Sequence, residues 1–435
     1  MPRLLSLFGH VVVFHLAVLI SSDLHASMRD GEGLLLADTV ARDMCHAPLA
    51  DPAALLPAGM ALVAEEGGLT ADISGRRLLS LDLGQGGEAV IDILVQRGVL
   101  RRLRMEYAAP LPGGVRPEAM VQYGPDCMPA LARRLRYDAA DAARPVRLVH
   151  LQADLLTVSF VEELDPPVPP GSDPGGVTVA HIDSGVNYRL SHIADRLARD
   201  GSGASLGYDF WDMDPRPFDL DTSRSPFFPL RHGSAVAGIL IAEAPGVRLV
   251  PYRYPRGKME RMAELVSAAH RAGARIVLMP LGSNDAAEWD AFRRAAEARP
   301  GMLFVVSAGN NGRDIDRAPV YPAAFPLANM ITVTSADAFG RLAPGSNWGR
   351  KSVDLMVPGE GIETIDHRGA IAPASGSSFA VPRVAALAVR LLEHNPGWST
   401  VELIEAIRVR TVRGYGRARA DVAWGWIPNP ADDGR

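Results

Sequence analysis

Residues 177–185 read VTVAHIDSG, an apolar run from Val177 to Ile182 that is followed by an acid, Asp183. A short apolar run of this kind is consistent with a buried strand of a parallel sheet. In such sheets, reactive side chains gather at the carboxyl ends of the strands. The sequence therefore predicts that Asp183 lies at the functional edge of an α/β domain.

Strands and helices alternate in the residues that follow Asp183. Apolar runs predict further strands, and small-residue or amphipathic stretches between them predict helices. This alternation favours a mainly parallel sheet with helices on both faces. The predicted strands cover residues 247–254, 275–281 and 302–306, and the predicted helices cover 232–244, 259–272 and 285–298.

The chain before residue 165 has a different pattern. Alternating apolar and polar residues at 89–95, 100–107, 146–151 and 155–161 predict a small β-rich domain over residues 27–164, with one helix near 129–136. Residues 165–176 read DPPVPPGSDPGG, and proline at this density predicts an extended linker. We therefore expect a catalytic domain over residues 177–435.

The amino terminus has the features of a secretory signal peptide. Arg3 precedes an apolar run over residues 4–20, and small residues around Ala26 suit cleavage, which predicts a signal peptide over 1–26. A membrane anchor is the alternative, but His10 and His15 interrupt the run and leave it short for a bilayer. We expect a secreted or periplasmic protein with no membrane association after cleavage.

Length, composition and charge exclude some classes of function. The chain has 435 residues, of which 47% are hydrophobic and 22% charged, and a net charge of -5 gives no basic surface for nucleic acid. Its two cysteines are Cys45 and Cys127. Because export preserves disulfides, we predict that they form a bridge, which leaves no thiol nucleophile in the carboxy-terminal region.

Three short motifs hold the residue types that nucleophilic catalysis needs. Asp183 follows the first strand, His232 begins the sequence HGSAVAG, and Ser378 lies in GSSFAVP at the start of an apolar helix. A serine hydroxyl needs an adjacent base, and the base needs a carboxylate to fix its tautomer. Each residue also has a structural interpretation: Asp183 as a turn residue, Ser378 as a helix N-cap and His232 as a core histidine.

Together with SAGNNG at residues 307–312, these motifs resemble the subtilisin-like (subtilase) family over residues 177–428, with the triad order Asp, His, Ser. The resemblance implies that Asp183 is the orienting acid, His232 the general base and Ser378 the nucleophile. It also implies that Asn310 donates its amide to the oxyanion, a contact whose loss costs about 100-fold to 1,000-fold in turnover. A turn that tolerates positive φ is the structural alternative for Asn310.

The resemblance further implies a groove in which substrate adds as a β-strand. Pro280 departs from the family pattern because it lacks the backbone N–H that such pairing uses. A pocket for the residue before the scissile bond is expected to favour a medium apolar side chain. The residues implied in substrate binding are Pro280, Leu281, Gly282, Asn311, Val320 and Ala323.

Three other positions depart from the family pattern. Ala235 and Arg383 stand where the family often has histidine, and neither position moves the catalytic proton. Phe379 stands where the family commonly has methionine next to the serine, so oxidation to a sulfoxide is not open to it.

No organic cofactor and no metal site is predicted. Calcium is common in the resembled family, and an acidic run could supply oxygen ligands, but prolines break its spacing and a solvated loop is favoured. The run comprises Asp209, Asp212, Asp214, Asp219 and Asp221.

The sequence therefore predicts a secreted serine endopeptidase that hydrolyses polypeptides through an acyl-enzyme. The amino-terminal domain is expected to be either a cleaved intramolecular inhibitor or chaperone, or a retained accessory domain. Two other functions stay open: a catalytically silent binding protein on the same scaffold, and a peptide ligase or acyl-transferase that uses the same triad.

Overall fold

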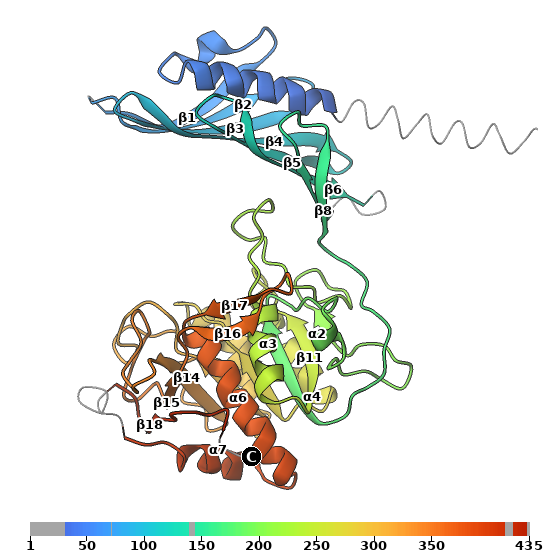
Figure 1. Ribbon diagram of the computed structural model, residues 1–435, viewed down its shortest axis with the longest axis vertical. Helices are drawn as coiled ribbons and strands as arrows, with labels where there is room; N and C mark the ends of the chain where they lie inside the picture. The colour runs from blue at the N-terminus through green and yellow to red at the C-terminus, as the bar shows by residue number, and fades with distance from the viewer. Residues whose placement is uncertain (1–30, 71, 139–143, 414–420, 433–435) are drawn as a thin grey trace, which may run out of the picture. The chain divides into compact units, whose positions relative to one another are not determined.

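The computed structural model describes residues 31–70, 72–138, 144–413 and 421–432 and divides into two compact units (Figure 1). One unit comprises the described residues up to Asp165 together with Thr222–Pro229, and the other comprises Pro166–Asp221 and the described residues from Leu230 onward. The predicted signal peptide lies outside the described residues. Among the residues that are described, none of the helices combines the length and hydrophobicity that a membrane span requires.

The first unit is an eight-stranded antiparallel sheet whose strands pair in chain order, with a helix over residues 31–46 on the sheet. Leu34, Ala37, Ala41 and Met44 of this helix recur at helical spacing and belong to the same buried cluster as residues of the sheet. The strands are β1 (Ala61–Leu69), β2 (Gly75–Asp82), β3 (Glu88–Gln96), β4 (Val99–Leu111), β5 (Gly114–Tyr123), β6 (Pro129–Tyr137), β7 (Pro145–Leu151) and β8 (Val158–Glu163).

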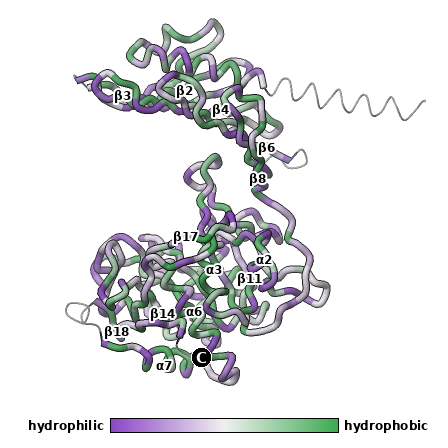
Figure 2. The backbone as a smooth tube through the Cα atoms, viewed as in Figure 1, coloured by the Kyte–Doolittle hydropathy of each residue, from purple (hydrophilic) through white to green (hydrophobic). Residues whose placement is uncertain are grey.

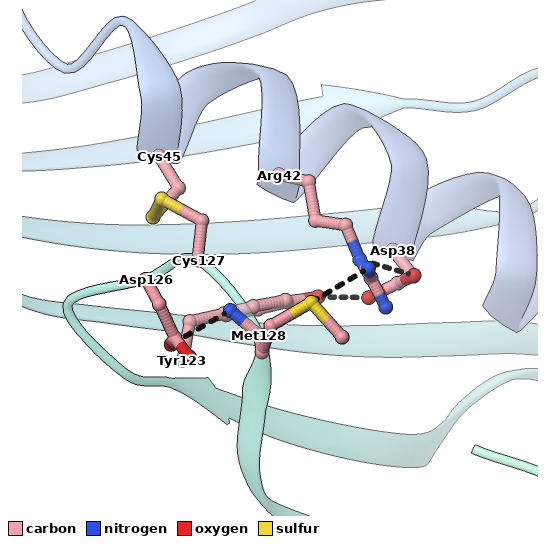
Figure 3. The surroundings of a disulfide bond; sticks show 7 residues. All are labelled: Asp38, Arg42, Cys45, Tyr123, Asp126, Cys127 and Met128. Carbon is pink, nitrogen blue, oxygen red and sulfur yellow. Dashed lines mark hydrogen bonds and ion pairs between the residues drawn. A yellow bond between two sulfur atoms is a disulfide. The ribbon is translucent and has the colours of Figure 1, made fainter. Parts of the chain in front are cut away.

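A disulfide joins this helix to the turn between β5 and β6 (Figure 3). Cys45 and Cys127 are bonded, with Cα atoms 5.7 Å apart, which confirms the predicted pairing. Nearby, the hydroxyl of Tyr123 donates to Asp38 Oδ1 at 2.8 Å. Burial and the adjacent Asp38 carboxylate raise the pKa of Tyr123. The disulfide and this hydrogen bond therefore join helix and sheet in addition to their apolar core.

The helix predicted near residues 129–136 is wrong, because this segment is strand β6. Its sequence, PALARRLR, is rich in good helix formers, but β6 pairs with both β5 and β7 and buries Ala132 and Leu135. Pairing on both sides overrides local helix propensity.

The second unit contains an eight-stranded parallel sheet in the order β10-β11-β9-β12-β13-β14-β15-β18. Its side chains alternate between two buried clusters, as Val179 and Ala180 of β9 show. The strands are β9 (Val177–Asp183), β10 (Tyr208–Asp209), β11 (Val247–Arg253), β12 (Ile276–Met279), β13 (Leu303–Ser307), β14 (Met330–Ala336), β15 (Leu355–Pro358) and β18 (Gly425–Trp426). An antiparallel pair, β16 (Ile362–Ile365) and β17 (Ile371–Ala374), lies apart from this sheet.

Helices cover both faces of the parallel sheet, as predicted. Residues of α3 and α6 belong to one buried cluster, and residues of α4 and α5 belong to the other. Helix α6 is hydrophobic along most of its length (Figure 2). The helices are α2 (Ser191–Ala194), α3 (Gly233–Glu243), α4 (Met262–Arg271), α5 (Asp290–Glu297), α6 (Ser377–His394) and α7 (Thr400–Arg408).

Of the linker predicted over residues 165–176, residues 166–176 have no regular structure but are bound to the second unit. The hydroxyl of Tyr188 donates to the carbonyl of Pro166 at 2.6 Å, and the Arg248 guanidinium pairs with Asp173 at 2.7 Å. Val168 packs against the core on the α3 and α6 face. This segment therefore belongs to the fold of the second unit.

Candidate active site

Asp183 is the last residue of β9, and its carboxylate is buried. Asp183 Oδ1 accepts from the backbone N–H of Ser184 at 2.6 Å, and Nδ1 of His232 lies 2.8 Å from Oδ1 and 2.9 Å from Oδ2. Burial acts to raise the pKa of Asp183. The positive charge of the His232 imidazolium, the nearby His181 ring and the hydrogen bonds of His232 outweigh burial, so this pKa lies below its ordinary value. The carboxylate is therefore ionised and directed at an imidazole.

His232 directly precedes α3, and its side chain is 32% exposed. Gly233 permits the close approach of α3 to β9, because a Cβ there would lie 2.0 Å from the carbonyl oxygen of Gly185. Burial acts to lower the pKa of His232, but the charge and hydrogen bond of Asp183 outweigh it and raise this pKa, with Asp219 and Asp221 adding to the effect. A base held in this way accepts a proton readily, and it is neutral only above its raised pKa.

A second buried carboxylate, Asp219, lies beside this pair. Asp219 Oδ1 accepts from Ser184 Oγ at 2.6 Å and from the backbone N–H of His232 at 3.1 Å. Asp219 Oδ2 accepts from the backbone N–H of Ser234 at 3.0 Å and also from Ser234 Oγ. The sequence placed Asp219 in an acidic run expected to be a solvated loop, with calcium binding as the alternative, and no motif spacing indicated these contacts. Asp219 fixes the backbone that holds His232.

Ser378 is the second residue of α6, after Gly376 with φ +121°. Its N–H lies in the first helical turn, where backbone donors have no acceptor within the helix. The ring of the adjacent Phe379 lies 5.6 Å from that of His232, centroid to centroid. Ser378 and His232 are thus on neighbouring elements. Among the described residues, however, the structure records no hydrogen bond between their side chains.

Asn310 lies in the loop after β13 and contacts the start of α6. Its Oδ1 accepts from the backbone N–H and the hydroxyl of Ser377, both at 2.9 Å, so its amide nitrogen remains a donor. The fully buried Asn347 fixes this loop. Its Oδ1 accepts from the N–H of Asn311 at 2.9 Å, and its Nδ2 donates to the carbonyl of Ala308 at 2.8 Å. No sequence signal indicated Asn347.

A pocket of about 340 Å³ lies beside Ser378 and Asn310. Five of the six residues expected to bind substrate line it, while the buried Ala323 is a core residue whose carbonyl accepts from Thr332 Oγ1. The exposed lining is mainly polar, contrary to the apolar pocket that the resemblance implied. The lining residues are Pro280, Leu281, Gly282, Ser283, Asn284, Ser307, Gly309, Asn310, Asn311, Val320 and Ser378.

The two positions where the family often has histidine have structural roles. The carbonyl of Ala235 accepts from Thr364 Oγ1 at 2.7 Å, which ties α3 to β16. The Arg383 guanidinium is buried, pairs with Glu243 at 2.6 Å and donates to the carbonyl of Pro358 at 2.9 Å. Neither residue contacts the Asp183–His232 pair in a recorded interaction.

The solvated loop expected for the acidic run is wrong, because Asp209, Asp219 and Asp221 are buried and each acid of the run has a protein partner. Asp209 and Asp212 pair with the buried Arg253, Asp214 pairs with Arg216, and Asp221 pairs with Arg256. Within the described part of the chain, no group of three or more histidine, cysteine or acidic side chains is arranged to hold a metal ion. The expectation that calcium is not required stays a prediction.

A parallel sheet covered on both faces, with an acid–imidazole pair beside a helix that begins at a serine, defines a serine-type peptidase of the subtilisin kind. Comparison with known families agrees with this class. The subtilase family model matches residues 175–426, which is more than half of the sequence, so the chain belongs to the subtilase family.

Individual relatives are serine proteinases. The chain is 30% identical over 248 residues to a thermophilic serine proteinase of Bacillus sp. (strain AK1), covering 53% of this chain and 55% of the relative. It is also 30% identical over 247 residues to alkaline serine exoprotease A of Vibrio alginolyticus, covering 54% and 42%. The chain thus spans about half the length of these relatives. The crystal structure of a lanthipeptide protease shares the fold, with a TM-score of 0.50 at 20% identity over 60% of this chain and 88% of that one.

Proposed function

We propose that this protein is a secreted serine endopeptidase that hydrolyses peptide bonds through an acyl-enzyme. The observation that carries this proposal is the contact of His232 with the buried carboxylate of Asp183 at 2.8 Å. Such a carboxylate holds the imidazole in the tautomer whose Nε2 is free to accept a proton, and it stabilises the imidazolium that forms. A relative named a halolysin-like extracellular serine protease, from Natrialba magadii and 28% identical over 277 residues, supports export.

The first half of the reaction forms the acyl-enzyme. Ser378 Oγ attacks the carbonyl carbon while His232 Nε2 takes its proton. The Asn310 amide and the first-turn N–H of Ser378 donate to the oxyanion, where fixed dipoles stabilise the charge that develops. The tetrahedral intermediate then expels the amine, which takes the proton from His232. An ester between Ser378 and the acyl part of the substrate remains.

The second half returns the free enzyme. Water attacks the ester carbon, His232 takes a proton from this water, and the second intermediate releases the carboxylic acid. The proton on His232 returns to Ser378 Oγ. No external oxidant, reductant or cofactor enters this sequence, because each proton taken by His232 is later given to a leaving group.

The polar lining of the pocket of about 340 Å³ supports a preference for the type of side chain that precedes the scissile bond. Asn284 and Asn311 offer amide groups, whereas the hydroxyl of Ser283 already donates to Glu288 Oε2 at 2.6 Å. We propose that a neutral polar side chain is accepted there. The substrate backbone adds as a strand along Leu281 and Gly282. Cleavage of a peptide library, followed by mass spectrometry, measures this preference and separates hydrolysis from acyl transfer to an amine.

A fluorophosphonate probe tests the proposal. It should label the wild type covalently and should not label Ser378→Ala, because only a serine activated by its histidine reacts. Ser267→Ala is the matched control, since Ser267 lies on α4 and its hydroxyl bonds the carbonyl of Ala263. A wild type that stays unlabelled while folded supports the silent binding protein instead.

We further propose that the first unit acts on the second as an inhibitor or chaperone that is later removed. Because residues 166–176 are bound to the second unit, processing should leave them attached to it, with a new amino terminus at or before Pro166. Amino-terminal sequencing of secreted material measures this. A start near Ser27 supports a retained accessory domain.

A further inference from the structure

A second buried imidazole lies against the Asp183 carboxylate. His181 precedes Asp183 by two residues on β9, and residues at this spacing on a strand project to the same face. His181 Nε2 lies 3.4 Å from Asp183 Oδ2, and the His181 side chain is fully buried. Among the described residues, neither ring nitrogen of His181 has a hydrogen-bond partner within standard geometry.

This arrangement is unusual for a core position. A polar ring without hydrogen-bond partners is disfavoured in the interior, and an aliphatic side chain would fill the site without that cost. The adjacent strand residues Ala180 and Ile182 are apolar and fully buried. Among the described residues, the ionic contact recorded for His181 is with the carboxylate that orients His232. A role for His181 therefore acts through Asp183.

The two oxygens of Asp183 have unequal surroundings. Oδ1 accepts from the Ser184 N–H at 2.6 Å and lies 3.2 Å from Ser184 Oγ, in addition to its contact with His232. Within the described part of the chain, the recorded contacts of Oδ2 are with two imidazoles, His232 at 2.9 Å and His181 at 3.4 Å. His181 thus lies beside the oxygen of Asp183 that accepts no hydrogen bond from Ser184.

We propose that His181 is a positioning residue for the catalytic acid, fixing the Oδ2 side of Asp183 and drawing off part of the negative charge that this carboxylate offers to His232. This inference rests on the proposed peptidase function. A donor that shares the carboxylate makes the His232 imidazolium less stable and so favours the neutral base. His181 therefore extends activity to lower pH than an aliphatic residue would allow.

Other charged groups around this pair stay the same when only residue 181 changes. They are Asp219 and Asp221 before α3, His367 between β16 and β17, Tyr254 after β11, and the guanidinium groups of Arg231 and Arg256. A difference between variants at residue 181 therefore reports on the contact with Asp183.

The test compares the pH dependence of kcat/KM for wild type, His181→Val and His181→Gln, using one chromogenic peptide. Valine removes the donor and suits a buried strand, whereas glutamine places its amide nitrogen where Nε2 lies. One neutral hydrogen bond corresponds to about a fivefold change in an equilibrium constant, which is the upper limit for a 3.4 Å contact outside hydrogen-bond geometry. We expect the acid limb of His181→Val to move up by at most about 0.7 pH unit, with at most about fivefold lower kcat/KM below the limb, and His181→Gln to keep the wild-type profile.

NMR titration of the His232 ring in a Ser378→Ala background gives a second readout that needs no turnover. His181→Val in that background should raise the titration midpoint of His232 by the same amount. An unchanged midpoint, or equal shifts for valine and glutamine, would overturn the role of His181. Wild-type protein that fails to react with a fluorophosphonate would instead overturn the peptidase function, so the two failures are distinguishable.

Discussion

Replacing Asp219 with asparagine tests whether the buried carboxylate holds His232 in place. Each oxygen of Asp219 accepts from one backbone N–H and one serine hydroxyl, with His232 and Ser184 on Oδ1 and Ser234 on Oδ2. The asparagine amide must replace one of these oxygens. In either orientation its NH2 group faces a backbone N–H, which cannot turn to accept, although a serine hydroxyl can.

The expected loss of stability follows from this mismatch. A buried backbone N–H left without an acceptor costs about 1–3 kcal/mol, and loss of charge on the remaining hydrogen bonds costs about 1 kcal/mol more. Removing a buried charge from a low-dielectric site opposes this loss, but the donors around Asp219 remain in place. We expect Asp219→Asn to lower the free energy of unfolding of the second unit by about 2–4 kcal/mol.

Urea unfolding followed by tryptophan fluorescence measures this loss. All six tryptophans lie after residue 210, so the signal reports on the second unit alone. A Ser378→Ala background prevents self-digestion. Asp290→Asn is the matched control, because its ion pairs with Arg293 and Arg294 are on the surface and such pairs contribute about 0–1 kcal/mol. Equal urea midpoints for Asp219→Asn and its parent would refute the reasoning.

For Asp219→Asn we also predict a shift of the acid limb of kcat/KM, in the direction opposite to that of His181→Val. Asp219 contributes to the raised pKa of His232. Its neutralisation should therefore move the acid limb of kcat/KM to lower pH. A limb that moves upward would show that Asp219 does not act on His232 through its charge.

Three further predictions concern other parts of the chain. Phe379 cannot form a sulfoxide, so activity should survive mild peroxide and Phe379→Met should lose it; rapid loss in the wild type would contradict this. Cys45→Ser opens a loop with a sequence separation of 82 and should destabilise the first unit by about 4 kcal/mol, seen as faster proteolysis of that unit with an unchanged tryptophan transition. Burial raises the pKa of Asp354 to about 6. The folded state therefore keeps a proton that the unfolded state releases, so stability should fall as pH rises from about 4 to about 6, and Asp354→Asn should flatten this urea-midpoint profile.

The sequence predicted the second unit better than the first because of how each buries its residues. Strands such as β9 are apolar on both faces, which is a strong signal for a covered parallel sheet. In the first unit, β6 has the composition of a helix, and only pairing with β5 and β7 makes it a strand. Pairing between distant segments leaves little trace in local composition.

The candidate site was predicted in part for a similar reason. Motifs and strand ends indicated Asp183 and His232, whose contact the structure shows at 2.8 Å. They did not indicate Asp219 or Asn347, whose hydrogen bonds join segments with no fixed spacing. The polar lining of the pocket was also missed, because the residues beside Ser378 come from three separate loops.

Helices α3 and α6, which follow the catalytic base and bear the nucleophile, both lack a cap from the residue before them, which is why the sequence did not indicate the side chains that hold them. The side chain at the N-cap of α3 makes no capping hydrogen bond, and the N-cap of α6 is Gly376. Asp219 accepts from the N–H of His232 just before α3 and from the N–H of Ser234 in its first turn, and Ser184 Oγ accepts from the N–H of Gly233 between them. Asn310 accepts from the N–H of Ser377 at the start of α6. A cap from a distant segment satisfies the helix start and at the same time fixes that segment against it. The positions of His232 and Ser378 therefore depend on side chains that lie far away in sequence, which is why substitutions at Asp219 should act on catalysis as well as on stability.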